Sequence, residues 1–348
     1  MDLTTRYLGL ELANPLIPSA SPLSRSLDSA RRLEDAGASA IVMYSLFEEE
    51  IIDEEQALAR FLHYQDIGDP EASSYLPMPD TFKSAVDRYL DQLAILKASL
   101  GIPVIASLNG LTRGGWIHYG KDLQEAGADA LELNVYHIAA DPGESPAEVE
   151  GHYLDLLEDL KGRVSVPIAM KIGSQFSALP HFLQRLEGAG AAGVVMFNRF
   201  YQPSIDLKTL KVVPQLALST SAESLLAMRW IGLVRDHVRL SLGATGGIHS
   251  ASDVIKMVLA GADATQLCST LLQHGPGQLA TILSDLRSWM EQNEYDSLSQ
   301  MKGSVSQAKA INPAAFAHAN YMKVLDSYTP AAGVWVSAIP SKIFGSHG

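Results

Sequence analysis

The chain has 348 residues, of which 47% are hydrophobic and 19% charged, and its net charge at pH 7 is −13. This composition indicates a globular protein with one large domain or two ordinary ones, and it argues against nucleic acid as a main partner, because phosphate binding needs clustered Lys and Arg. Cys268 is the only cysteine, so we expect no disulfide, no metal site and a cytoplasmic location. No stretch reaches 18 apolar residues, so we also expect no membrane span.

Short apolar runs, each followed by a turn and then a helical pattern, recur along the chain. They are rich in Val, Ile, Leu and Ala and alternate little with polar residues, which is typical of parallel strands covered on both faces. The eight predicted strands span residues 15–20, 39–45, 103–108, 129–135, 167–172, 192–198, 238–244 and 263–268.

Amphipathic stretches at 26–37, 116–127, 179–190 and 250–261 all end on Ala-Gly, and glycine suits the left-handed position that ends a helix. Eight βα units in succession favour an α/β fold of the (β/α)8 barrel type over a doubly wound sheet. The extra length forms insertions at 48–88 and 199–224, after the second and sixth strands, and a tail of helices and loops at 285–348. We therefore expect a single barrel domain spanning 1–348.

Polar and small residues stand at the carboxyl ends of the predicted strands, where barrel enzymes keep their active sites. Their convergence on one rim is harder to obtain by chance than any single strand-end asparagine. The candidate site residues are Ala20, Ser21, Asn109, Asn134, Lys171, Asn198, Thr245, Gly246, Gly247, Cys268 and Ser269.

A phosphate site is expected where Gly246 and Gly247 follow the seventh strand and Ser269 follows the eighth. The loops after these two strands commonly bind phosphate in (β/α)8 barrels, because glycine lets the backbone approach an anion and hydroxyl and N–H groups complete the site. The alternative is an ordinary glycine turn that leads into a serine-capped helix.

Lys171 lies inside an apolar strand, where an unpaired charge is costly. A negative ligand group at the barrel mouth, such as the N1–C2=O edge of a reduced flavin, would satisfy it. The alternative is a salt bridge to Glu132 on the neighbouring strand.

The sequence resembles the dihydroorotate dehydrogenase family of FMN-dependent barrels, from about residue 6 to about residue 330 and in the right order. It is most similar to the soluble branch and its dihydroorotate dehydrogenase-like relatives. The resemblance rests on LGLELANPLIPSASP (8–22), IASLNG (105–110), LELN (131–134), MKI (170–172), MFN (196–198), GATGGIHSASDVIKMVLAGADATQLCSTLLQHGP (243–276) and ANYMKVLDSY (319–328).

The resemblance implies FMN at the barrel mouth and a small substrate stacked on its ring. Ala20 and Ser21 would contact the ring, Asn109 and Asn134 would bond polar edges of flavin or substrate, and Lys171 would stabilise the reduced ring. Asn198 would face the substrate together with Asn134. The ribityl phosphate would be held by Thr245, Gly246, Gly247, Cys268 and Ser269.

The sequence also departs from the family pattern. His137 stands where the family has its Cys or Ser base, and Ala139 replaces a second asparagine two residues further on. Tyr44 replaces a lysine at the end of the second strand, and the substrate loop becomes ASSYLP (72–77). Cys268 takes the place of a glycine before the strand-8 hydroxyl residue. The flavin site is mostly preserved, whereas about half of the substrate site is changed.

Several functions follow from this reading. The first is oxidation of dihydroorotate to orotate in pyrimidine biosynthesis, with His137 as base, since imidazole is a competent base near neutral pH. A related reaction on another small substrate and a non-redox phosphate-binding barrel are alternatives, and a transfer-RNA dihydrouridine synthase-like barrel fits the acidic charge poorly. The resemblance further implies a homodimer and, in some relatives, an electron-transfer partner subunit.

Overall fold

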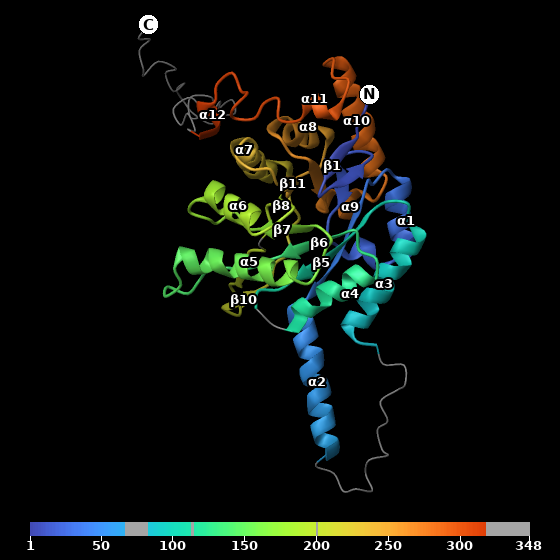
Figure 1. Ribbon diagram of the computed structural model, residues 1–348, viewed down its shortest axis with the longest axis vertical. Coiled ribbons are helices and arrows are strands. Elements are labelled where there is room, and N and C mark those ends of the chain that lie inside the picture. Colours follow the sequence, from blue (N-terminus) through green and yellow to red (C-terminus); the bar gives the residue numbers. More distant parts are fainter. Residues whose placement is uncertain (67–82, 113–114, 200, 318–348) are drawn as a thin grey trace.

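The protein is an eight-stranded parallel barrel, described by a computed structural model over residues 1–66, 83–112, 115–199 and 201–317 (Figure 1). The strand order is β3-β12-β11-β8-β7-β6-β5-β4. The backbone N–H of Ser39 donates to Leu16 O at 3.0 Å and brings β3 and β4 together, which closes the sheet. The strands are β3 (Leu16–Pro18), β4 (Ile41–Phe47), β5 (Val104–Asn109), β6 (Ala130–Asn134), β7 (Ile168–Ile172), β8 (Gly193–Met196), β11 (Ser241–Thr245) and β12 (Ala264–Leu267).

Helices surround the barrel (Figure 1). The prediction of a (β/α)8 barrel is confirmed, since all eight predicted strands and the four predicted helices are present. The glycines at the ends of those four helices have positive φ, from 95° at Gly190 to 130° at Gly261. The helices are α1 (Leu27–Asp35), α3 (Ala85–Ser99), α4 (Tyr119–Glu125), α5 (Pro146–Lys161), α6 (Leu179–Gly188), α7 (Ser224–Val234), α8 (Ala251–Ala260), α9 (Ser269–His274) and α10 (Gln278–Gln292).

The two insertions have regular structure of their own. Helix α2 (Glu48–Asp66) begins directly after β4 and projects away from the barrel (Figure 1), while residues 72–77 lie outside the described part of the chain. The second insertion contains an antiparallel hairpin of β9 (Ser204–Asp206) and β10 (Lys211–Val213). Beyond α10, the tail has two short helices up to residue 317, α11 (Leu298–Met301) and α12 (Ala314–Ala317). No helix in the described ranges is long and apolar enough to cross a membrane.

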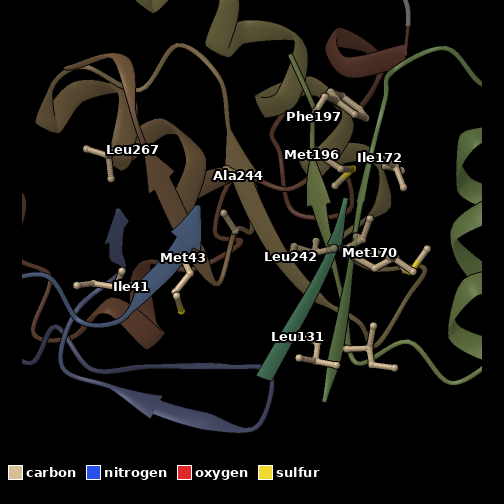
Figure 2. Packing of buried hydrophobic residues seen from close by; sticks show 14 of the residues in the cluster. Ile41, Met43, Leu131, Met170, Ile172, Met196, Phe197, Leu242, Ala244 and Leu267 are labelled. Carbon is tan, nitrogen blue, oxygen red and sulfur yellow. The ribbon is translucent and has the colours of Figure 1, made fainter. Parts of the chain in front are cut away.

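Two layers of apolar side chains hold the barrel. Between the strands and the helices lies the larger cluster, in which Leu131, Met170 and Leu242 point outward from the sheet (Figure 2). Inside the barrel a smaller cluster includes Ala130 and Ala169, with Tyr7 from the hairpin of β1 (Thr5–Tyr7) and β2 (Leu10–Leu12). Because side chains alternate along a strand, this inner face is the one that leads to the barrel mouth.

The inner face changes from apolar to polar toward the carboxyl ends of the strands. Ala130 is followed two residues later by Glu132, Ala169 by Lys171 and Ala264 by Gln266, and all three polar side chains are buried. The fold therefore places a buried polar layer directly beneath the open end of the barrel.

Candidate active site

A cavity of about 940 Å³ opens at the carboxyl ends of the strands. Its size falls in the range of small-molecule and cofactor sites, roughly 300–1,000 Å³. Of the residues singled out from the sequence, ten line it: Ala20, Asn109, Asn134, Lys171, Asn198, Thr245, Gly246, Gly247, Cys268 and Ser269.

Lys171 forms the centre of the cavity floor. Its Nζ lies 3.1 Å from Glu132 Oε1 and donates to Ser19 Oγ at 3.2 Å and to Gln266 Oε1 at 3.3 Å. Gln266 Nε2 in turn donates to the second carboxylate oxygen of Glu132 at 2.5 Å. The salt bridge between Lys171 and Glu132, considered above as an alternative to a ligand, is thus present. Lys171 also lines the cavity, so the salt bridge does not remove its side chain from the cavity surface.

The three asparagines meet on one side of the floor. Asn109 and Asn134 are register partners at the ends of β5 and β6, and both side chains are buried. Asn198 follows β8, and its amide Nδ2 donates to Asn134 Oδ1. Amide groups fixed in this way present both donors and acceptors to a ligand with a heteroatom edge.

Gly247 is where the backbone needs glycine most. It has φ +73°, and a Cβ at this position would lie 2.5 Å from the backbone nitrogen of Ser224 and 2.6 Å from Thr220 O. Gly246 also has a positive φ of +86°, but a Cβ there would meet only Phe197 O at 3.9 Å. This turn holds the backbone close to the cavity, as a phosphate site requires.

Ser219 joins the same side of the cavity and was not anticipated from the sequence. Its hydroxyl lies 2.9 Å from Ser269 Oγ and 3.1 Å from His249 Nε2, and its N–H donates to Ser269 Oγ at 3.2 Å. It belongs to the insertion after β8, whose path cannot be read from strand periodicity. Two hydroxyls and two glycines thus converge on one end of the cavity.

Cys268 lines the cavity beside this cluster. Burial raises the pKa of its thiol above the usual value, and the positive charges of Lys171 and Arg199 only partly oppose this effect. The thiol is therefore protonated at neutral pH, which suits a packing contact rather than a nucleophile.

His137 and Ser21 are not among the residues that line the cavity. The imidazole Nε2 of His137 lies 3.1 Å from Glu144, whose other oxygen is 3.0 Å from His152 Nε2. The neighbouring Tyr136 does line the cavity, and its hydroxyl accepts the N–H of Tyr201 at 3.1 Å. Ser21 is buried and ends the segment in which Ser19, rather than Ser21, reaches the Lys171 network.

The wall formed by α2 is acidic. Glu49, Glu50 and Asp53 line the cavity and are exposed. Arg199 lines the opposite side, but its guanidinium is paired with Glu223 at 3.0 Å. Among the described residues that line the cavity, the cations are Lys171 and Arg199, and each is paired with a carboxylate.

A family model for dihydroorotate dehydrogenase matches residues 82–290, more than half of the chain. The chain belongs to the dihydroorotate dehydrogenase family. The family named from sequence motifs is therefore confirmed, and its matched region contains nine of the ten cavity residues given above, all except Ala20.

Relatives with this name align over much of the chain. The catalytic subunit of dihydroorotate dehydrogenase B (NAD(+)) from Thermoplasma acidophilum is 26% identical over 310 residues, which are 87% of this chain and 98% of the relative. Dihydroorotate dehydrogenase A (fumarate) from Lactobacillus helveticus is 30% identical over 213 residues, 59% of this chain and 68% of the relative. The catalytic subunit of the B-type enzyme from Shouchella clausii is 29% identical over 209 residues, 58% and 67% of the two chains.

Proposed function

We propose that this protein is an FMN-dependent oxidoreductase that acts on a CH–CH group, oxidising dihydroorotate to orotate or a closely related small substrate. The observation that carries the proposal is the cavity floor, where the buried Lys171 and three asparagine amides face the same space. The names of the relatives point to the same reaction. We also propose that residues 1–348 form one domain. We further propose a cytoplasmic location, because a chain with a single cysteine suits a reducing compartment.

The residues present fit FMN. A phosphate group could bind at the tight turn of Gly246 and Gly247. The hydroxyls of Ser219 and Ser269 lie beside this turn and would complete the site. Lys171 Nζ, Ser19 and Gln266 offer polar contacts to a ring edge. A non-redox barrel that binds a phosphorylated metabolite would need only the phosphate-binding groups. The polar groups around Lys171 are therefore what favours the flavin.

The protein's own residues would act mainly by orientation and charge. FMN, when bound, supplies the acceptor for a hydride. Lys171 would hold a positive charge next to the ring edge that becomes negative, and Asn109, Asn134 and Asn198 would fix the substrate by hydrogen bonds. Preorganised groups of this kind need not reorganise during the reaction, which is the main source of their effect.

His137 is our proposed base, although its imidazole contacts Glu144 and His152 and does not line the cavity. It would reach a substrate carbon only after the segment that follows β6 changes conformation. A carboxylate partner stabilises the imidazolium form that a base acquires after it accepts a proton. Glu144 would supply this partner only if the contact persists when the imidazole faces the substrate.

A second candidate substrate class is favoured by the acidic wall. Both cavity cations are paired, and Glu49, Glu50 and Asp53 add negative charge. An anionic substrate such as dihydroorotate is disfavoured by this field relative to a neutral ring of the same size. Comparing dihydroorotate with neutral dihydrouracil as reductants of the bound flavin would separate the two substrates.

We propose a homodimer whose interface includes the β9–β10 hairpin. Ile205 and Val212 are opposite each other in the hairpin and are 62% and 71% exposed, while Leu207 and Leu210 at its turn are 84% and 80% exposed. A two-stranded hairpin is marginally stable alone, and clustered exposed apolar side chains mark interaction sites. Two relatives are named as catalytic subunits, and a partner subunit that transfers electrons, as the family resemblance implies, is the alternative occupant of this surface.

The test of the proposed activity is spectroscopic. The purified protein should carry or bind FMN, and its oxidised spectrum should bleach when a reductant of the right class is added without oxygen. A colourless protein that does not bind added FMN would exclude the flavoprotein assignment and leave the phosphate-binding barrel.

A further inference from the structure

A second cavity, of about 680 Å³, lies at the other end of the barrel. Its lining includes Ala192 just before β8, Ser241 at the start of β11 and Asp263 just before β12. These positions are at the amino ends of parallel strands, whereas the residues of the candidate active site follow the carboxyl ends. The two cavities are therefore on opposite faces, and a ligand in one would not touch a ligand in the other.

The charge of this cavity is opposite in sign to the net charge of the protein. Five basic residues and two acidic residues line it, while the chain carries 39 acidic against 26 basic residues. The five basic side chains come from separate segments that only the fold brings together. They are Arg6, Arg235, Arg239, Lys302 and Lys309.

Two of these cations are held in place by one buried carboxylate. Asp263 is 5% exposed, and its two oxygens lie 3.1 Å from Arg235 Nη1 and 2.7 Å from Lys302 Nζ. Arg235 also donates to the backbone oxygen of Gly261 at 3.1 Å. Two cations on one carboxylate leave one positive charge in excess. The contacts of Arg235 and Lys302 with Asp263 fix the position of that charge.

The remaining basic groups are available to a ligand. Arg239 and Lys309 are exposed, and no side-chain partner of either is found within the described ranges. Arg6 has only a distant contact of 3.8 Å to Glu11, with both side chains exposed. Arginine and lysine together are the usual groups that bind phosphate oxygens.

We propose that this cavity binds a compact phosphorylated anion. Among the described lining residues, five cations stand against two carboxylates. A positive excess remains even with Glu11 beside Arg6 and Glu187 at the backbone N–H of Arg239, which suits a ligand with more than one negative charge. No aromatic residue lines the cavity within the described part of the chain, so a phosphate or diphosphate group, rather than a stacked base, is what it recognises. Because the site is distinct from the flavin site, it can bind an anion that is neither substrate nor cofactor.

The test uses the whole protein, with and without saturating FMN, in a low-salt buffer with inorganic pyrophosphate as the probe. Isothermal titration should give saturable binding that FMN does not displace. Arg239→Ala/Lys309→Ala should weaken it by about tenfold or more, as expected for the loss of hydrogen bonds to charged groups. The matched control Arg31→Ala/Lys256→Ala removes two exposed cations on α1 and α8 and should leave binding unchanged.

Three results would overturn the proposal: no saturable binding to the parent protein, equal weakening in both double variants, or displacement of pyrophosphate by FMN. The last would assign the anion to the active-site end. Thermal unfolding without the probe checks that both double variants are folded, and Lys309→Glu, which reverses one exposed charge, should abolish binding if the cavity is the site.

Discussion

Lys171 Nζ lies 3.1 Å from Glu132 Oε1, and the two side chains are 8% and 1% exposed. Burying either charge alone would carry a large desolvation penalty, and the opposite charge of the partner offsets part of it. Because Gln266 and Ser19 complete the network, Lys171 cannot turn away from the cavity. The pair thus gives the active site a fixed cation whose position is set by the strands.

Breaking this pair should be severe. Glu132→Ala leaves the Lys171 ammonium buried and unpaired, and the free energy of unfolding should fall by about 3–5 kcal/mol. Urea unfolding of the FMN-free protein followed by circular dichroism measures it. Lys83→Met, which removes an exposed partner of Asp91, is the control and should have no measurable effect. Equal stability of the two variants would contradict the described network.

The glycine turn allows a matched comparison of neighbouring residues. Gly247→Ala should lower FMN affinity by more than tenfold and destabilise the protein, because its Cβ would meet backbone atoms at 2.5 Å. Gly246→Ala carries a similar positive φ with open space, so only the backbone strain of roughly 1–2 kcal/mol applies. Fluorescence titration with FMN distinguishes them. If Gly246→Ala were the more damaging change, the packing argument would be wrong.

The thiol of Cys268 should react slowly at neutral pH. Burial raises its pKa above the ordinary 9.0, so the midpoint of the pH–rate profile for alkylation should lie above that of a free thiol. Because the pKa of this thiol is higher in the folded than in the unfolded protein, its contribution to the free energy of unfolding is constant below the unfolded pKa. That contribution falls as pH rises from the unfolded pKa toward the folded pKa. Fast alkylation near pH 7 would refute this description.

His137→Ala separates the two roles open to this residue. If His137 is the base, anaerobic flavin reduction should slow by roughly 10²–10⁴-fold while FMN affinity is unchanged. His152→Ala removes the other histidine on Glu144 and controls for damage to the segment. A rate equal to that of the parent would show that His137 is only a structural partner of Glu144.

The exposed hairpin gives a prediction about assembly. Ile205→Thr/Val212→Thr keeps strand-forming side chains but removes the apolar pair, and it should shift the protein from dimer to monomer in light-scattering measurements. Ile311→Thr changes an isoleucine elsewhere that is even more exposed and should not. A dimer that persists in the hairpin variant would place the interface on another surface.

The barrel could be predicted from the sequence because parallel strands buried on both faces produce dense apolar runs. The strand-end residues Asn109, Asn134 and Lys171 could be placed for the same reason, since strand polarity brings them to one rim. Glu132 is predicted from the sequence only as a possible partner for Lys171. Its place inside the barrel also follows from the strand, because residues two apart face the same side and Ala130 points inward.

Residues in the connecting segments could not be placed in this way. Ser219, Arg199 and the β9–β10 hairpin belong to the insertion after β8, where no periodicity fixes the path of the chain. The same holds for His137, whose direction depends on its contact with Glu144 in the same connecting segment. The acidic wall depends on α2 beginning directly after β4. The residues of α2 are strong helix formers without Gly or Pro, but strand periodicity does not indicate that this helix lines the cavity.

The most direct test is anaerobic titration of the FMN-loaded protein with dihydroorotate, followed by the visible flavin band. The proposed function predicts that this band bleaches and that orotate perturbs the oxidised spectrum. If dihydroorotate neither reduces the flavin nor binds, while the protein holds FMN, the dihydroorotate assignment is contradicted.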